Sequence, residues 1–108
     1  MEGTVSEGKK FDQDKTRLDL VYPQFVESVG KVLTFGAKKY EPNNWQKVDD
    51  PVNRYYAAAL RHLIAWREGE KIDLESGLSH LAHAACNLMF LQYFEDLENI
   101  NGTIHDIQ

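Results

Sequence analysis

The sequence has 108 residues, of which 43% are hydrophobic and 27% are charged, and its formal net charge is −5. This length allows one domain and excludes a two-domain enzyme with a separate cofactor module, and the composition excludes a disordered chain. The acidic balance argues against a binder of nucleic-acid polymers, which normally carries a basic excess.

The negative charge is unevenly distributed along the chain. Residues 1–30 carry a net charge of −2 and residues 72–108 carry −6, whereas residues 31–71 carry +3. The middle of the chain is therefore a candidate anion-binding surface within an acidic protein.

The N-terminal residues 1–20 are polar and show no sustained periodicity. We expect an arm that is ordered only where it docks, through Phe11, Leu18 and Leu20. The chain shows neither a signal-peptide pattern nor an apolar stretch long enough to span a membrane, and its single Cys86 cannot form an internal disulfide. We therefore expect a cytoplasmic protein with no membrane partner.

The first helix is predicted to begin at Pro23, a residue tolerated at the first helical position. Apolar residues follow at spacings of three and four, namely Phe25, Val26, Val29, Val32 and Leu33. This spacing is typical of an amphipathic helix. Lys38 and Lys39 suit its C-terminal end, and residues 41–45 have the composition of a turn.

The second helix is predicted to begin at Asp50-Pro51, with the acid as N-cap, and to stop at Glu68-Gly69. Its apolar stripe consists of Tyr56, Leu60, Leu63 and Ile64.

A third helix is predicted from about Leu74 to about Leu97, with Asp73 as its cap. Its centre is apolar nearly all round, which is typical of a helix buried centrally or between subunits. The fold class is therefore all-α, with an arm at 1–20, a helical domain at 21–99 and a frayed tail at 100–108. Because three helices make a thin core, we expect a homo-oligomer completed by an intersubunit helical bundle.

His80, His83 and Asn87 share one face of the third predicted helix. Each of these polar groups needs a partner, because an unpaired buried group costs about 1–3 kcal/mol. The stripe can be a satisfied interface contact or a ligand site. A metal site with His62 as a third ligand is a further alternative, but no second pair of Cys or carboxylate ligands stands at metal spacing, so we expect no metal here.

Cations and aromatic residues are concentrated before and within the second predicted helix. Arginine and lysine bind phosphate, whereas tyrosine and tryptophan offer faces on which a base can stack. The alternative is a solvated charged loop with Trp45 in the core. Together with the polar stripe, the candidate ligand-binding residues are Lys38, Lys39, Tyr40, Asn44, Trp45, Arg54, Arg61, His62, His80, His83 and Asn87.

Carboxylates could instead hold magnesium, which prefers oxygen ligands. Glu70 and Asp73 have a suitable spacing but lie in a predicted turn, and Glu95 and Glu98 come late in the chain. Because no complete four-carboxylate set is present, we assign no catalytic residue and expect no cofactor.

Several blocks together resemble a phage and prophage family, the N-terminal domain of dATP/dGTP diphosphohydrolases. They are KTRLDL (15–20), LTFGAKKY (33–40), NW (44–45), ALRHL (59–63) and SGLSHLAHAACN (76–87). The resemblance implies that longer members carry a MazG-like catalytic domain after this one, and we expect this chain to hold the small domain without it.

Two functions are consistent with this resemblance. The first, which we favour, is binding of a phosphorylated purine nucleotide without hydrolysis. In a phage this would suit sequestration, in the host cytoplasm, of an immune signal such as cyclic ADP-ribose or a cyclic dinucleotide. The alternative is a magnesium-dependent pyrophosphohydrolase acting on dATP or dGTP, with an acid set of Glu68, Glu70, Asp73 and Glu75 and with His62 or His80 as general base. A purely structural oligomerisation domain is the third possibility.

Overall fold

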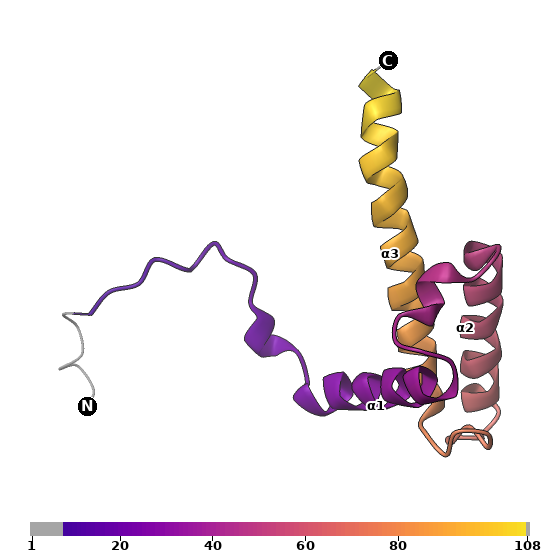
Figure 1. Cartoon of the computed structure of the whole chain (residues 1–108). Coiled ribbons are helices and arrows are strands. Elements are labelled where there is room, and N and C mark those ends of the chain that lie inside the picture. The colour runs from indigo at the N-terminus through magenta and orange to yellow at the C-terminus, as the bar shows by residue number, and fades with distance from the viewer. Residues whose placement is uncertain (1–7, 108) are drawn as a thin grey trace.

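The computed structural model describes residues 8–107, with side chains described as far as residue 100. The helices are α1 (Pro23–Lys39), α2 (Pro51–Arg67) and α3 (His80–Ile107), and two short 3-10 turns, η2 (Leu18–Leu20) and η3 (Asn44–Lys47), precede α1 and α2. Within the described residues the only strand-like feature is an isolated bridge between Ile72 and Ser79. The predicted all-α fold with three main helices is confirmed (Figure 1).

The first two helices begin where the sequence predicts. Pro23 and Pro51 each occupy the first turn of their helix, where the missing N–H costs no hydrogen bond. Asp50 is the N-cap residue of α2, as predicted, but its side chain makes no cap hydrogen bond and instead accepts one from the Asn53 amide at 3.2 Å. Gly69, with φ of 107°, follows the end of α2 in a conformation that favours glycine.

The third helix begins later than predicted, at His80 and not near Leu74. Residues 70–79 instead form a compact loop, closed by the Ile72–Ser79 bridge and by a hydrogen bond from the His80 N–H to the Lys71 carbonyl at 3.0 Å. Asp73 does cap a turn, but the turn lies inside this loop. The helix also ends later than predicted, at Ile107 and not near Leu97.

The helices α2 and α3 lie side by side and run in opposite directions, and α1 crosses the lower part of α3 (Figure 1). Val32 of α1 packs with Ala82 and Cys86 of α3 in the buried core. Small side chains at Ala59, Ala82 and Ala84 are almost fully buried, which allows the helix backbones to approach closely.

Much of the apolar surface is uncovered in the single chain. Tyr56 and Ile64, on the predicted apolar stripe of α2, are 57% and 55% exposed. The predicted docking of the arm is not seen, because Phe11 and Leu18 are 82% and 73% exposed and the arm extends away from the helices (Figure 1).

The intersubunit bundle and the division into arm, domain and tail stay predictions. No helix in the part of the chain that the structure describes is long and apolar enough to cross a membrane.

Candidate functional site

A cleft of about 720 Å3 lies where the C-terminal half of α1, the segment 40–48 and the first turn of α2 face the beginning of α3. Two acidic residues of the loop between α2 and α3, Asp73 and Glu75, also line the cleft. The polar and aromatic residues that line it are Thr34, Phe35, Lys39, Tyr40, Glu41, Asn43, Asn44, Trp45, Arg54, Tyr55, His62, Asp73, Glu75, His83, Asn87 and Phe90.

An aromatic cluster forms one wall of the cleft. The Trp45 indole stacks on Phe90 with ring centroids 4.5 Å apart and meets Tyr93 edge-on at 4.9 Å. The Tyr55 hydroxyl donates a hydrogen bond to the Trp45 carbonyl at 2.7 Å, which fixes the segment before α2 against that helix. Trp45 is therefore packed by α3 on one face and still contributes to the cleft.

Two cations and three carboxylates share the cleft lining. The cations are Lys39 and Arg54, and the Lys39 ammonium donates a hydrogen bond to the Glu75 carboxylate, which raises the pKa of Lys39. The other carboxylates are those of Glu41 and Asp73. An anionic ligand would therefore have to compete with Glu75 for Lys39.

A cluster of three imidazoles lies at the junction of α2 and α3. The Nδ1 atoms of His62 and His80 are 2.8 Å apart, and the rings of His62 and His83 stack with centroids 4.5 Å apart. His80 is only 4% exposed, and its Nε2 lies 2.6 Å from a carboxylate oxygen of Glu70. Burial, followed by the neighbouring imidazoles, lowers the pKa of His62, which favours its neutral form.

The loop residues Asp73 and Ser76 hold the third imidazole. Asp73 Oδ2 accepts hydrogen bonds from the Ser76 N–H and hydroxyl, both at 2.9 Å, and the Ser76 hydroxyl lies 2.7 Å from His83 Nε2. Burial opposes ionisation of Asp73, but the Ser76 hydrogen bonds outweigh it and lower the pKa of this carboxyl. Burial also lowers the pKa of His83. Asn87 donates from Nδ2 to the His83 carbonyl at 2.9 Å.

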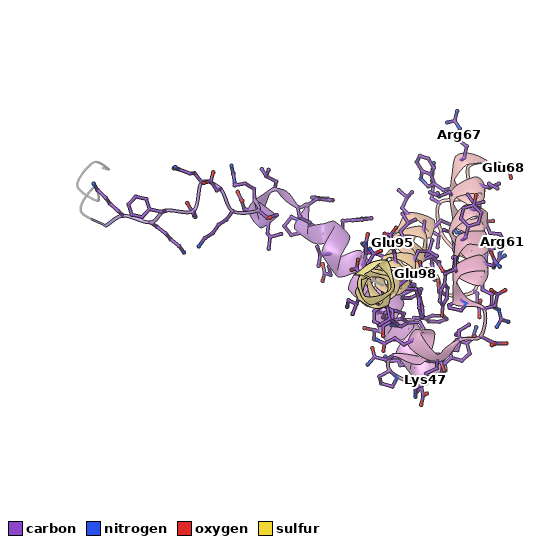
Figure 2. All side chains as sticks on the ribbon, turned by 90° about the horizontal axis from the view of Figure 1, so that it is seen from above. Lys47, Arg61, Arg67, Glu68, Glu95 and Glu98 are labelled. Carbon is purple, nitrogen blue, oxygen red and sulfur yellow. The ribbon has the colours of Figure 1, made fainter. Side chains whose placement is uncertain are left out.

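The structure brings most of the predicted site residues to this one cleft. Those that line it are Lys39, Tyr40, Asn44, Trp45, Arg54, His62, His83 and Asn87. His80 lies directly behind His62. Lys38 and Arg61 are outside the lining, and Arg61 points away from the other helices (Figure 2).

Sequence reasoning did not include three residues of this site. Tyr55 and Ser76 had no predicted role, and Glu75 entered only the acid set of the pyrophosphohydrolase alternative. The Asp73–Ser76 spacing was the available signal, because an acid three residues before a serine commonly closes a turn of this kind.

The four acids of the pyrophosphohydrolase alternative do not form one oxygen site in the single chain. Glu70 bonds His80, Glu75 bonds Lys39, and Glu68 points outward from α2 (Figure 2). The donor set that converges instead is rich in nitrogen, since ligand atoms of His62, Asp73 and His80 lie within 4.8 Å of one another. This set does not fit magnesium, which takes octahedral oxygen ligands.

Comparison with known proteins places the chain in a family. The sequence model of the family described as "dATP/dGTP diphosphohydrolase, N-terminal" matches residues 5–102, and the chain belongs to this family, as the motifs predict. A dATP/dGTP diphosphohydrolase of Salmonella phage PMBT28 is 43% identical over 84 residues, which are 78% of this chain and 28% of the relative. The chain thus spans less than a third of that relative. No solved structure matches it.

Proposed function

We propose that the cleft binds a phosphorylated purine nucleotide. The observation that carries this proposal is that Lys39, at the end of α1, and Arg54, in α2, line the same cleft as Tyr40 and Trp45 of the segment that connects these helices. A nucleotide requires cations for its phosphates and a flat apolar surface for its base, and this cleft offers both. Its volume of about 720 Å3 is in the range of small-molecule sites.

In this arrangement Arg54 and Lys39 contact the phosphates. Arg54 offers a planar fork that matches phosphate oxygens, and the only described hydrogen bond of its side chain is a long one of 3.3 Å to the Asp49 carbonyl. Trp45 and Tyr40 contact the base or sugar. The polar groups of His62, His83 and Asn87, on the α2–α3 side of the cleft, contact the ribose or the edge of the base. His80 supports His62 from behind.

A second candidate is hydrolysis to a nucleoside monophosphate and pyrophosphate. It is favoured by the name of the phage relative, dATP/dGTP diphosphohydrolase, of which this chain covers 28%. Because most of that relative lies outside the matched part, its activity is carried to this chain only as a proposal. His62 has a lowered pKa and lines the cleft, so it is the residue that would accept a proton from an attacking water.

One experiment separates binding from turnover. The purified protein is incubated with dATP, dGTP, dCTP or dTTP, with and without added divalent metal, then heat-denatured, and the released small molecules are chromatographed. Recovery of intact purine nucleotide supports binding without hydrolysis, and metal-dependent release of monophosphate and pyrophosphate supports the second candidate. Retention of no purine nucleotide, or equal retention of all four, contradicts the proposed purine site.

The same protocol tests the narrower prediction of signal sequestration. Cyclic ADP-ribose and cyclic dinucleotides are added in place of the deoxynucleotides. Sequestration predicts that a cyclic ligand is retained more tightly than dATP or dGTP and is recovered intact.

A further inference from the structure

We infer that His62, Asp73 and His80 form a binding site for one divalent transition-metal ion of the zinc class. Each residue offers one ligand atom, and these three atoms lie within 4.8 Å of one another. They come from three different segments, namely the middle of α2, the α2–α3 loop and the first residue of α3. Two imidazoles and a carboxylate are a common ligand set for zinc, and three protein ligands leave a fourth position open.

Glu70 orients the buried histidine of this set. A carboxylate only accepts hydrogen bonds, so His80 Nε2, 2.6 Å away, must donate to Glu70. In the tautomer that carries its proton on Nε2, His80 has its lone pair on Nδ1, which is the atom that faces His62. A metal-binding histidine usually donates its other ring N–H to a carboxylate in this way. Glu70 is thus a positioning residue and not a ligand.

The second nitrogen ligand is Nδ1 of His62, which faces Nδ1 of His80. His62 Nδ1 lies 2.8 Å from His80 Nδ1, so with the His80 tautomer given above His62 donates its Nδ1 proton to His80 in the metal-free chain. If His62 carries its proton on Nε2 instead, two lone pairs face the same space. Nitrogen ligands of tetrahedral zinc are about 3.3 Å apart, so the rings need to separate by only roughly 0.5 Å.

Asp73 supplies the negative charge of the set. Its Oδ2 is fixed by two hydrogen bonds from Ser76, which hold the carboxylate in place before a metal arrives. Both Asp73 and His62 line the cleft, so the open coordination position faces the cleft and can take water or a ligand oxygen. The positive charge of the ion would also offset the negative charge of the carboxylates that line the cleft.

The geometry favours this set over the His80-x-x-His83 pair suggested by spacing. His83 Nε2 faces the Ser76 hydroxyl at 2.7 Å and lies 3.7 Å from Asp73 Oδ2, and its ring stacks face to face on His62. The group whose ligand atoms all lie within 4.8 Å of one another includes His62, Asp73 and His80 but not His83. His83→Gln therefore discriminates between the two ligand sets.

The test uses the metal alone and does not depend on nucleotide binding. The full chain is treated with EDTA, dialysed and titrated with Zn2+ by calorimetry, and Co2+ is added to a second sample to record its visible spectrum. We expect one Zn2+ per chain and the strong visible absorption of four-coordinate Co2+. Absence of stoichiometric binding, or a Co2+ spectrum typical of six-coordinate oxygen ligation, overturns the inference.

Variants then assign the ligands. His62→Gln, Asp73→Asn and His80→Gln should each weaken Zn2+ binding by about 100-fold or more, whereas His83→Gln and the exposed Glu68→Gln should stay within about threefold of the wild type. Glu70→Ala should weaken Zn2+ binding by about 10- to 100-fold. Glu70→Gln should restore most of the lost affinity, because its amide oxygen still accepts the hydrogen bond from His80. Loss of binding in His83→Gln overturns the proposed ligand set.

A measurement on the wild type covers the case in which a variant does not fold. Long-range proton–nitrogen NMR spectra of the imidazoles report which ring nitrogen binds the metal. Zn2+ should shift Nδ1 of His62 and His80 and leave His80 Nε2 protonated. Shifts confined to Nε2 atoms, or to His83, contradict the site.

Discussion

His62 and His80 meet through their Nδ1 atoms, 2.8 Å apart, although they stand on different helices. This contact ties the middle of α2 to the start of α3 at the edge of the cleft. Because His80 is almost fully buried, it relies on His62 and Glu70 to satisfy its two ring nitrogens. The same pair supports the cleft in the metal-free chain and supplies two nitrogens of the proposed metal site.

Acid should destabilise the metal-free fold. Burial lowers the pKa of both His62 and His83. Among the neighbouring groups, the carboxylates of Asp73 and Glu75 favour the charged imidazole. His80 and Arg61 disfavour the charged imidazole. An unfolded histidine has a pKa of about 6.5, so the stabilisation is present above that pH and is lost as the pH falls through the lower folded values. The lowered pKa of Asp73 extends the loss to still lower pH.

The check is urea unfolding in EDTA at about pH 7.5 and about pH 5.5, on either side of the histidine pKa. The urea midpoint should fall at the lower pH, and the variant His62→Gln/His83→Gln should show a smaller fall. A midpoint that is unchanged or higher in acid would show that these imidazoles are not held neutral by burial.

Cys86 should resist alkylation in the native protein. The thiol is 1% exposed, it donates to the Val29 carbonyl at 3.6 Å, and burial raises its pKa to about 11. The thiolate is the reactive form, so a shift of about two units from the ordinary thiol predicts a rate about 100-fold below that of the urea-unfolded chain. Cys86 is the single cysteine, so iodoacetamide labelling followed by mass spectrometry measures it directly. Equal rates in the two states would contradict the packing of α1 on α3.

Phe90 should be important for stability because it joins the core to the cleft wall. Its ring contacts Trp45 and Tyr55 at centroid distances of 4.5 and 4.8 Å and packs against the Val32 core. Phe90→Ala should lower the free energy of unfolding by about 2–3 kcal/mol, which is somewhat less than the loss expected for a fully buried phenylalanine. Urea unfolding measures this change.

The exposed Tyr56 on α2 is the matched comparison for Phe90. In a monomer, Tyr56→Ala should change stability by less than about 0.5 kcal/mol, because this side chain is 57% exposed. A cost comparable to that of Phe90→Ala, together with a dependence on protein concentration, would instead show that the α2 stripe is covered in an oligomer.

Glu75 should limit nucleotide affinity. Its carboxylate holds Lys39 and adds negative charge to the cleft. Glu75→Gln should therefore bind a purine nucleoside triphosphate up to about fivefold more tightly, since an exposed ion pair of this kind is worth at most about 1 kcal/mol. Calorimetric titration at a fixed salt concentration measures the nucleotide affinity. Lys39→Gln is expected to weaken binding. Weaker binding in Glu75→Gln would mean that Glu75 itself contacts the ligand.

The starts of α1 and α2 could be predicted because they depend on local chemistry. Pro23 and Pro51 open these helices, and Gly69 follows the second, whatever packs around them. The start of α3 could not be predicted in this way, because its candidate residues near Leu74 are drawn into a loop closed by the Ile72–Ser79 bridge. That closure is a contact between segments, which helical periodicity does not report.

The difference between local chemistry and contacts between segments also applies to the site. Arg54 and Arg61 are seven residues apart and should share a helix face, yet only Arg54 lines the cleft. The segment 40–48 contributes to the cleft beside the first turn of α2, and Trp45 is fixed there by Phe90 and Tyr55 from other parts of the chain. These contacts between segments place the cleft beside Arg54 and not beside Arg61, which is two turns further along the same helix.

The most direct test of the nucleotide site compares Arg54→Ala with Arg61→Ala by calorimetric titration with dATP and dGTP in EDTA and again with Zn2+. Both variants remove one arginine from the same helix, so the net charge change is matched. Loss of a charge-assisted phosphate contact of about 1.5–3 kcal/mol predicts about 10- to 100-fold weaker binding for Arg54→Ala, with Arg61→Ala close to wild type. Equal affinities for the two variants, or a loss confined to Arg61→Ala, would contradict the cleft as the nucleotide site.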